Sequence, residues 1–404
     1  MASLKVGILR EGKIPVDRRV LLTPDQCLEV MKRYPHIELL IQPSDVRCIS
    51  NKEYAEKGLK LQEDLSGCDI LLGIKEVPIH LLMANKTYLF FSHTIKKQSH
   101  NQRLFQEIAE KKITLIDYEA LKDKQGNRVI AFGRFAGIVG AYNTFKLLGK
   151  KYKLFDLKNA YDCFDMADLK SQLQHVKLPP LKFVITGAGR VGKGALEIMD
   201  ELGMKRVNPE VFLKLDHPTE FVYTVLSSKD YHERLDGKPF DASAFHSNPE
   251  GYRSTFPRYA FTADVLIATA YWDPAAPALF SIKDMHSPYF QIRLISDITC
   301  DIGGSIPSTV KPTNIYDPAY DFNPFTSDLE APFSDPRNVT VMAIDNLPCE
   351  LPRDASQDFG DQFIRNVLPD LMEEPYGDLI TRCEVLNKGN LMPAFEYLRD
   401  YLNG

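Results

Sequence analysis

The fold of this chain is decided by residues 182–199, which read Lys-Phe-Val-Ile-Thr-Gly-Ala-Gly-Arg-Val-Gly-Lys-Gly-Ala-Leu-Glu-Ile-Met. Lys182–Thr186 has the β-rich, apolar character of a buried strand, and a helix is expected to open at Lys193. Glycines between them let the backbone turn tightly and approach a pyrophosphate, whose charge the free amides of the helix N-terminus can hold. The stretch predicts a dinucleotide-binding turn, with a plain strand-to-helix turn as the alternative. The expected cofactor contacts are Gly187, Gly189, Arg190, Val191 and Gly192.

Short apolar strands alternate with longer amphipathic segments along the rest of the chain, which is typical of parallel sheets covered by crossover helices. In the first third, a helix is expected from Thr23-Pro24-Asp25, and strands are expected at Lys5–Leu9, Ile37–Ile41, Ile70–Ile74, Thr87–Phe91 and Ile113–Ile116. After Lys182–Thr186, strands are expected at Phe221–Leu226, Val265–Ala270, Arg293–Ser296 and Val339–Ile344. We therefore predict an α/β protein with two Rossmann-like, doubly wound parallel-sheet domains. Pro307–Arg337, rich in proline and aspartate, is expected to form a long excursion over the surface.

Length, charge and cysteine usage narrow the class of protein. The 404 residues exceed what one hydrophobic core accommodates, which also indicates two domains. The 49 basic and 54 acidic residues are mixed and give a net charge of −5, so no basic surface for nucleic acid is expected. Seven cysteines without a C-x-x-C pair indicate no disulfide framework and no metal site, and favour a reducing, cytoplasmic location. No signal h-region and no run of ~20 apolar residues occurs, so no membrane partner is expected.

The loop after the strand at Phe221–Leu226 is expected to read the adenosine ribose of the cofactor. NAD-binding proteins place an acid there to bind the ribose hydroxyls, but this chain has Ser227 and Ser228, followed by Lys229. Because Lys229 could face the 2′-phosphate of NADP, the loop favours NADP. Asp230 keeps NAD open as the alternative.

Ionisable side chains follow four of the strands expected in the N-terminal third: Arg10, Lys75, His93, and Asp117 with Glu119. In open parallel sheets ligands bind beyond the carboxyl ends of the strands, so these side chains are predicted to converge on one crevice. Burial and like charge lower the pKa of a lysine, so Lys75 and His93 could act as acid and base near neutral pH. The expected carboxylate clamps, which predict a di- or tricarboxylate substrate, are Arg10, Arg18, Arg19 and Lys96.

Six strings carry a resemblance to a known family: Gly73–Pro78, Phe90–Lys96, Leu115–Glu119, Ala131–Gly133, Asp297–Ser305 and Ile344–Pro348. They resemble saccharopine dehydrogenase of the lysine-forming type, and most closely the lysine–ketoglutarate reductase domain of bifunctional aminoadipic semialdehyde synthase. The likeness spans Val6 to about Leu371. The wider alanine dehydrogenase and transhydrogenase superfamily is similar in the Arg10–Pro24 pattern and the glycine motif.

The resemblance implies reversible condensation of lysine with 2-oxoglutarate and reduction of the resulting imine to saccharopine by NADH or NADPH. It implies that Lys75 and His93 are the acid and base. Substrate contacts are then expected at Arg10, Arg19, Lys96, Glu119, Arg128, Phe135 and Asp345, and further cofactor contacts at Ser227, Ser228, Lys229, Tyr271, Asp297 and Asp345. Residues 1–137 with 346–404 would form the substrate domain and residues 138–345 the dinucleotide-binding domain, with the active site in the cleft between them.

Two other functions remain open from the sequence. One is an enzyme with a smaller amine substrate, such as alanine dehydrogenase or an opine-type dehydrogenase. The other is a sensor that binds NAD(P)H without catalysis, although an intact Lys75 and His93 argue against it. The partners expected are amino-acid and 2-oxo-acid substrates, and the chain is expected to be a monomer or a homodimer.

Overall fold

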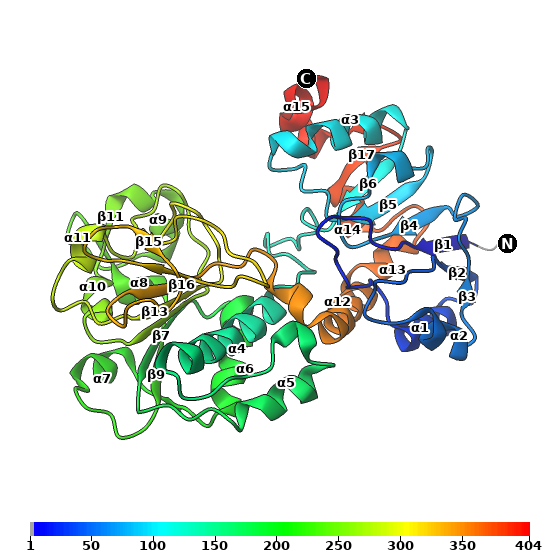
Figure 1. Ribbon diagram of the computed structural model, residues 1–404. Helices are drawn as coiled ribbons and strands as arrows, with labels where there is room; N and C mark the ends of the chain where they lie inside the picture. The colour runs from blue at the N-terminus through cyan, green and yellow to red at the C-terminus, as the bar shows by residue number, and fades with distance from the viewer. Residues whose placement is uncertain (1–3) are drawn as a thin grey trace. The chain divides into compact units, whose positions relative to one another are not determined.

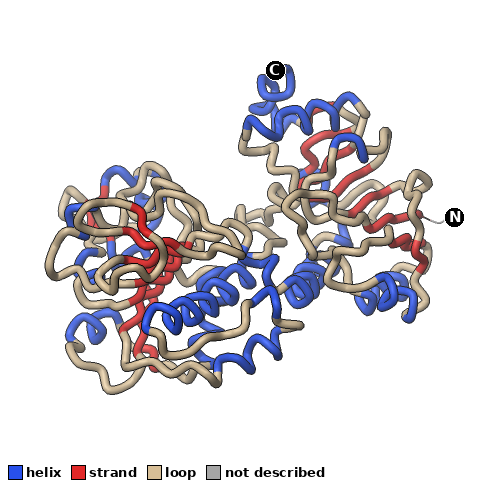
Figure 2. Tube along the Cα trace, in the orientation of Figure 1, coloured by secondary structure: helices blue, strands red, loops and turns tan. Residues whose placement is uncertain are grey.

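The computed structural model describes residues 4–404, and contacts along the backbone divide the chain into two compact units (Figure 1). Unit 1 contains Met1–Phe132 and Pro352–Gly404, and unit 2 contains Gly133–Leu351. The chain passes between the units after residues 132 and 351, a few residues from the limits expected at 137 and 345. Both units are built from strands and helices, which confirms the predicted α/β class (Figure 2).

The sheet of unit 1 has eight described strands in the order β18-β17-β6-β5-β4-β1-β2-β3. Its strands are β1 (Leu4–Ile8), β2 (Ile37–Ile41), β3 (Lys60–Leu61), β4 (Ile70–Leu72), β5 (Thr87–Phe90), β6 (Thr114–Asp117), β17 (Glu384–Asn387) and β18 (Asn390–Leu391). β1 to β6 pair in parallel, whereas β17 pairs antiparallel with β6 and β18. The last third of unit 1 therefore completes the sheet as well as covering it.

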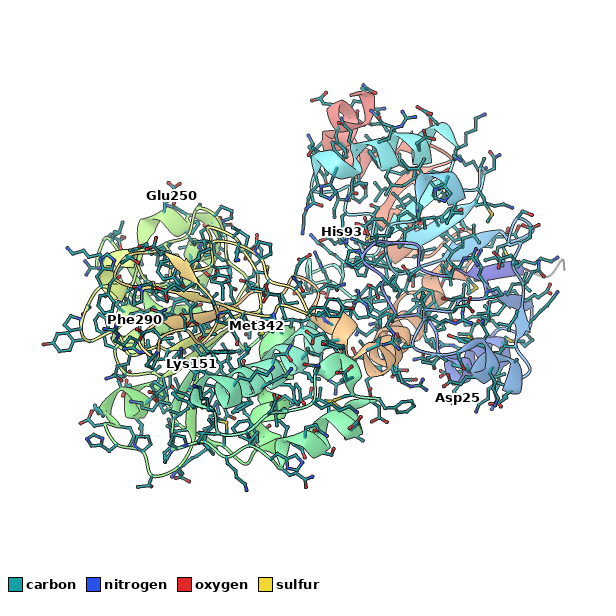
Figure 3. The ribbon with its side chains drawn as sticks, viewed as in Figure 1. Asp25, His93, Lys151, Glu250, Phe290 and Met342 are labelled. Carbon is teal, nitrogen blue, oxygen red and sulfur yellow. The ribbon has the colours of Figure 1, made fainter. Side chains whose placement is uncertain are left out.

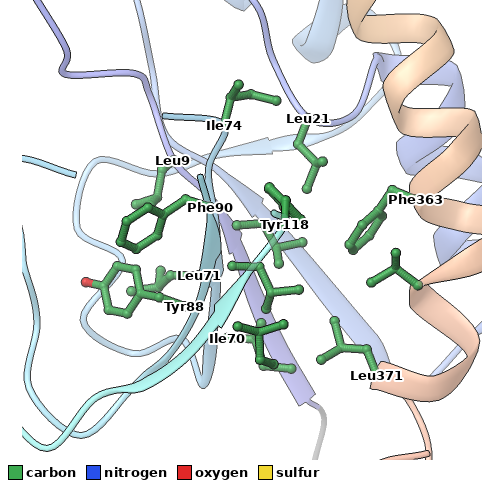
Figure 4. Close-up of a cluster of buried hydrophobic side chains, with 14 of the residues drawn as sticks. Leu9, Leu21, Ile70, Leu71, Ile74, Tyr88, Phe90, Tyr118, Phe363 and Leu371 are labelled. Carbon is green, nitrogen blue, oxygen red and sulfur yellow. The ribbon is translucent and has the colours of Figure 1, made fainter. Parts of the chain in front are cut away.

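Apolar side chains cover both faces of this sheet, as expected for parallel strands buried between helices. The helices of unit 1 are α1 (Pro24–Arg33), α2 (Asn51–Glu56), α3 (Gln102–Glu110), α12 (Pro352–Asn366), α13 (Leu368–Leu371), α14 (Asp378–Cys383) and α15 (Arg399–Asn403). Figure 4 shows Phe363 of α12 and Leu371 of α13 on one face, and Tyr88 and Phe90 of β5 on the other. α1 begins as expected, because Thr23 and Gln26 form a capping box and Pro24 occupies the first turn.

The sheet of unit 2 also has eight described strands, in the order β15-β14-β16-β13-β12-β7-β9-β8. Its strands are β7 (Lys182–Thr186), β8 (Lys205–Arg206), β9 (Val222–Leu226), β12 (Val265–Ala268), β13 (Leu294–Asp297), β14 (Tyr320–Phe322), β15 (Leu329–Glu330) and β16 (Val339–Met342). The chain builds β8 and β9 on one side of β7 and then crosses to β12 on the other side. This reversal beside β7 is a topological switch point, where open α/β sheets bind ligands.

The helices of unit 2 include two that cross at glycines. They are α4 (Gly133–Tyr152), α5 (Met166–Leu173), α6 (Arg190–Glu201), α7 (Pro209–Lys214), α8 (Ser228–Tyr231), α9 (Ala242–Ser247), α10 (Pro257–Ala260) and α11 (Ile282–Met285). A Cβ at Gly137 of α4 would meet the Val191 carbonyl, and one at Gly194 of α6 would meet the Arg134 carbonyl. The two helices therefore pack backbone against backbone beside the sheet (Figure 1).

Three sequence expectations were wrong in detail. α6 begins at Arg190, with Gly189 as its N-cap, and not at Lys193, so the glycine turn is shorter than expected. The segment Pro307–Arg337 is not only a surface excursion, because it contains β14 and β15, which pair antiparallel at one edge of the unit 2 sheet. No strand was expected after Val339–Ile344, but the C-terminal segment contributes β17 and β18. These strands have two to four residues, too few for a periodic signal.

The remaining elements of the described chain are short 3-10 helices and one small sheet. The 3-10 helices are Ile79–Leu81, Ser99–Asn101, Ala160–Asp162, Pro249–Gly251, Leu347–Glu350 and Pro393–Leu398, and a two-stranded antiparallel sheet in unit 2 pairs β10 (His232–Arg234) with β11 (Tyr252–Ser254). Among residues 4–404, no helix combines the length and the apolar character needed to cross a membrane.

Candidate functional site

A cluster of charged side chains lies beyond the carboxyl ends of the parallel strands of unit 1. Lys75 follows β4, His93 follows β5, and Glu119 follows β6. These strands are neighbours in the sheet, so their ends share one edge. The three positions therefore lie along one edge of the sheet, and Figure 3 marks the place of His93.

Glu119 is the centre of this cluster. Its side chain is only 4% exposed, and its Oε1 lies 2.9 Å from Lys96 Nζ and 2.7 Å from an Arg128 guanidinium nitrogen. Its Oε2 lies 3.6 Å from His93 Nδ1. Burial opposes ionisation of Glu119, but the nearby His93 and the positive charges of Lys96 and Arg128 hold its pKa well below its usual value. Glu119 is therefore a carboxylate that holds three of the predicted site residues together.

His93 lies between two carboxylates. Its Nε2 is 3.8 Å from Glu76 Oε1, and the ring stacks on Phe91 with centroids 6.0 Å apart. Its backbone is left-handed, with φ of 54°, a conformation that non-glycine residues rarely adopt and that often marks a functional position. Lys13 Nζ lies 2.9 Å from Glu76 Oε2, so this second carboxylate is itself paired. The imidazole is oriented from both sides while remaining partly exposed to solvent.

Lys75 is half-buried beside this histidine's partner Glu76. Burial lowers the pKa of its ammonium, and the charges of Arg19 and Lys13 lower it further. A lysine with a lowered pKa can exchange a proton nearer neutral pH than an exposed lysine can. This is the property that the sequence predicted for Lys75.

The backbone that carries Lys75 is held by a buried carboxylate, Glu11. Its Oε1 accepts a hydrogen bond of 2.7 Å from the amide of Ile74, and its Oε2 accepts one of 2.8 Å from the amide of Lys75. Burial and the nearby Asp17 charge raise the pKa of Glu11 to about 8. Glu11 thus fixes the chain at the point where it leaves β4.

Arg19 is buried against Asp17. Two guanidinium nitrogens of Arg19 donate to the Asp17 carboxylate at 2.9 and 2.5 Å, and the guanidinium lies 4.1 Å from the centre of the Phe132 ring. Burial opposes ionisation of Asp17, but the charge and hydrogen bonds of Arg19 hold its pKa well below its usual value. The expected carboxylate clamp at Arg19 is therefore already engaged by a carboxylate of the chain.

Sequence analysis missed four members of this region, namely Glu11, Lys13, Asp17 and Glu76. Glu76 directly follows Lys75 at the end of a strand, so the strand-end argument could have included it. Lys13 and Asp17 lie in the same loop as Arg10 and Arg19, where only the arginines were considered. Glu11 binds backbone amides more than 60 residues away in the chain, a partnership that no sequence pattern indicates.

Three further substrate contacts were expected from the sequence. Arg10 follows β1, but its guanidinium pairs with Glu63 at 2.6 Å. Phe135 is a buried residue of α4 in unit 2. Asp345 follows β16 in unit 2. Burial raises the pKa of the nearby Cys300 thiol to about 12, and the charge of Asp345 contributes to this increase.

The turn between β7 and α6 has the geometry that a pyrophosphate requires. Gly187 has a φ of 91°, and a Cβ there would lie 2.9 Å from the Ala270 backbone. A Cβ at Gly192 would meet the Gly187 carbonyl, whereas one at Gly189 would face open space. The first glycine thus permits the turn, the third permits close packing, and the second leaves room for a ligand. α6 begins at this turn with Arg190, and the N-terminal amides of a helix can hold a phosphate.

The loop after β9 has no acid available at its start. Ser227 is the N-cap of α8, and the Asp230 carboxylate accepts hydrogen bonds from the Ser227 amide at 2.7 Å and from its hydroxyl at 2.6 Å. Ser228 follows in the first turn of α8, and Lys229 is exposed there. The one acid of this loop is therefore engaged as a helix cap.

Two further expected cofactor contacts follow strands of unit 2. Tyr271 comes after β12, and 87% of its side chain is exposed. Asp297 ends β13 and is buried, and its oxygens accept hydrogen bonds from the Thr299 hydroxyl at 2.6 Å and the Thr309 hydroxyl at 2.8 Å.

Within the described part of the chain, no group of three or more His, Cys, Asp or Glu residues is placed to hold a metal ion.

Residues 7–139 match the family described as "Alanine dehydrogenase/PNT, N-terminal domain". A solved structure of L-alanine dehydrogenase covers 99% of this chain, with a TM-score of 0.66 and 15% sequence identity. The structure of the transhydrogenase from Sinorhizobium meliloti covers 96% of this chain, with a TM-score of 0.59 and 14% sequence identity. These likenesses confirm the predicted two-domain Rossmann-type fold.

Curated proteins similar to this chain confirm the resemblance found in its motifs. The α-aminoadipic semialdehyde synthase of Arabidopsis thaliana is 32% identical over 97% of this chain, and the mitochondrial enzyme of that name from Mus musculus is 29% identical over 98%. The chain spans only 41% and 47% of these two relatives. The NAD(+), L-lysine-forming saccharopine dehydrogenase of Yarrowia lipolytica is 24% identical over 93% of this chain and 94% of the relative.

Proposed function

We propose that this protein interconverts saccharopine with L-lysine and 2-oxoglutarate, using NAD(P) as the hydride carrier. The observation that carries the proposal is the cluster at the strand ends of unit 1, in which Glu119 holds His93, Lys96 and Arg128 beside a lysine of lowered pKa. Relatives named as saccharopine dehydrogenase, which match over almost their whole length, support the same reaction.

In the synthetic direction, the side-chain amine of lysine adds to the keto carbon of 2-oxoglutarate, and the carbinolamine loses water to form an imine. A reduced dinucleotide held at the glycine turn of Gly187, Gly189 and Gly192 would supply a hydride for the imine carbon, and an acid of the site would supply the proton for the imine nitrogen, which together give the secondary amine. The amine must be neutral to attack, and the departing hydroxyl needs a proton. Lys75 and His93 supply this acid and base chemistry, because one has a lowered pKa and the other is oriented by Glu76 and Glu119.

The substrate carboxylates are proposed to bind to Lys96 and Arg128. Both head groups are held by Glu119 Oε1, and their side chains are 60% and 40% exposed, so each retains faces that reach a solute. Arginine binds a carboxylate by its fork of donors and lysine by its point charge. We include Arg10, Arg19, Phe135 and Asp345 among the proposed substrate contacts.

For the cofactor, we propose NADP over NAD. In the loop after β9, Asp230 caps α8 and Lys229 is exposed. This loop therefore offers no free acid to bind the ribose of NAD. The names of the fungal relatives specify NAD(+), which supports the opposite preference. A direct comparison of the two cofactors is therefore part of the test.

We propose a cytoplasmic location, from the cysteine usage. None of the seven cysteines, all of which lie within residues 4–404, forms a disulfide, which fits a reducing compartment. The mammalian relatives are named mitochondrial, so a mitochondrial location is the alternative.

The test is absorbance at 340 nm with purified full-length protein and NADPH or NADH. Oxidation is expected only when lysine and 2-oxoglutarate are present together, with NADPH preferred. Alanine or ammonia with pyruvate, and ornithine with 2-oxoglutarate, serve as controls for the smaller-amine reactions. Oxidation with one of these pairs instead would identify a different dehydrogenase, and cofactor binding without oxidation would favour the sensor function.

A further inference from the structure

A pocket lies wholly within unit 2, beside the glycine turn. Its volume is about 620 Å3, which includes space open to solvent. It is lined at the strand ends by Thr186 of β7, Ser228 after β9, Ala270 after β12 and Ser305 after β13. These strands flank the switch point, where open α/β sheets bind their ligands.

The opposite wall comes from an inserted segment, residues 232–254, which contains β10, α9 and β11. From this segment His232 and Phe245 line the pocket, and their rings lie 4.5 Å apart between centroids. Figure 3 shows Glu250 of the same segment at the outer edge of the unit, so the segment runs from the pocket to the surface. Trp272, from the loop after β12, is also in the lining. Flat aromatic walls of this kind suit a flat aromatic ligand.

His232 has one nitrogen engaged and one without a partner. His232 is only 7% exposed, and its Nδ1 lies 3.1 Å from the Ser228 carbonyl oxygen. A carbonyl can only accept, so Nδ1 carries the proton and Nε2 presents a lone pair. Nε2 is buried and has no hydrogen-bond partner in the protein. Burial lowers the pKa of this imidazole to about 4, which keeps the ring neutral at physiological pH.

A flat ligand that donates a hydrogen bond would fit the aromatic pocket and pair with the unpartnered acceptor, His232 Nε2. The pocket adjoins Gly187 through Thr186 and Ala270, so a ligand whose phosphates lie on the glycine turn can place an aromatic base within it. A buried polar atom without a partner costs free energy that a donor on the ligand would recover.

We propose that this pocket takes the purine of the dinucleotide and that His232 Nε2 accepts a hydrogen bond from its 6-amino group. The inference rests on the proposed use of NAD(P) but adds a specificity determinant to it. Because Nε2 is covered in the structure, the base must displace the neighbouring side chains slightly to reach it. Hypoxanthine carries an oxygen in place of the amino group and would set two acceptors against each other, so it should bind about 10- to 100-fold more weakly.

The test compares the preferred reduced cofactor with its analogue that has hypoxanthine in place of adenine. Calorimetry on the full chain measures both dissociation constants, and the fluorescence of Trp272, the one tryptophan of the sequence, reports occupancy of the pocket. We expect the adenine form to bind about 10- to 100-fold more tightly and to change the Trp272 emission. Equal binding of the two forms, or binding without a change in emission, would overturn the proposal.

Variants separate the histidine from the pocket as a whole. His232→Phe keeps the ring and removes the acceptor, so both cofactor forms should then bind within about twofold of each other. The matched control is His217→Phe, at an exposed loop position of the same unit, which should retain the discrimination. Discrimination that persists in His232→Phe would exclude His232 as the acceptor while leaving the proposed reaction intact. A wild-type chain that binds neither NADH nor NADPH would instead contradict the proposed function itself.

Discussion

The Glu11 carboxylate accepts a hydrogen bond from the backbone amide of Lys75, with 2.8 Å between Oε2 and the nitrogen. Its other oxygen accepts from the preceding amide of Ile74 at 2.7 Å. The proposed acid–base lysine is therefore positioned through its own backbone by a residue of another loop. A carboxyl group suits this task because each of its oxygens can accept a hydrogen bond, whereas the nitrogen of an amide side chain can only donate.

Glu11→Gln should therefore displace Lys75 without removing it. The amide group of the glutamine would face one of the two backbone N–H donors, so one hydrogen bond is lost. We expect kcat to fall by about 10- to 100-fold with an unchanged cofactor dissociation constant, and the pH profile of kcat to shift because the surroundings of Lys75 change. Glu110→Gln, at an exposed position at the end of α3, is the control. A wild-type kcat and pH profile in Glu11→Gln would show that the contact has no part in catalysis.

Lys75→Met and His93→Gln remove the proposed acid–base groups directly. Each should lower turnover by about 100- to 10,000-fold, because general acid–base catalysis contributes a factor of this size. Cofactor affinity, measured by calorimetry, should stay at the wild-type value, since neither residue belongs to the glycine turn. His80→Gln, at an exposed position after β4, serves as the matched control. Wild-type turnover in both variants would rule out this pair as the acid and base.

The positions of Lys75, His93 and Glu119 could be predicted because parallel strands have a fixed relationship between sequence and space. Each residue closely follows an apolar strand, and parallel neighbours end at one edge of the sheet. The role of Glu119 as a shared partner could not be predicted, because it depends on where the side chains of Lys96 and Arg128 fold back.

The burial of His232 could not be predicted from the sequence either. In the sequence it stands in a polar context, typical of a surface histidine, but the structure buries it between Tyr231 and Phe245. Burial of this kind arises from how the inserted segment folds over the sheet, which no local pattern records. Likewise β14 and β17 are edge strands held by antiparallel pairing to distant partners, so their existence depends on tertiary contacts.

Gly189→Asp should abolish cofactor binding. A Cβ at this position meets no atom within 4 Å, so the substitution is sterically harmless to the empty turn. It would place a negative charge where the pyrophosphate approaches the N-terminus of α6. We expect a loss of at least about 100-fold in affinity for NADPH by calorimetry, with an unchanged thermal unfolding temperature. Gly67→Asp, also at a glycine with open space around it, is the control. Wild-type affinity in Gly189→Asp would place the cofactor elsewhere.

Glu350 gives unit 2 a pH-dependent stability. It is buried, and its Oε1 accepts a hydrogen bond of 3.0 Å from Asn143 of α4. Burial raises its pKa to about 8, against opposition from the Asn143 hydrogen bond and the Lys146 charge. Between the unfolded value near 4.5 and the folded value near 8, the folded state holds one proton that the unfolded state has released. Its stabilising contribution is thus complete below pH 4.5 and is lost as the pH rises towards 8.

Glu350→Gln replaces this carboxyl with a neutral group that keeps an acceptor for Asn143. One proton of difference corresponds to a slope of about 1.4 kcal/mol per pH unit in the free energy of unfolding, which the variant should lack between pH 5 and 8. Urea unfolding across this range should show the wild type losing stability with pH more steeply than the variant, so that the variant is the more stable at pH 8. Glu250→Gln, at an exposed position of the same unit, should follow the wild type. Parallel pH dependences for wild type and Glu350→Gln would mean that Glu350 is already ionised in the folded protein.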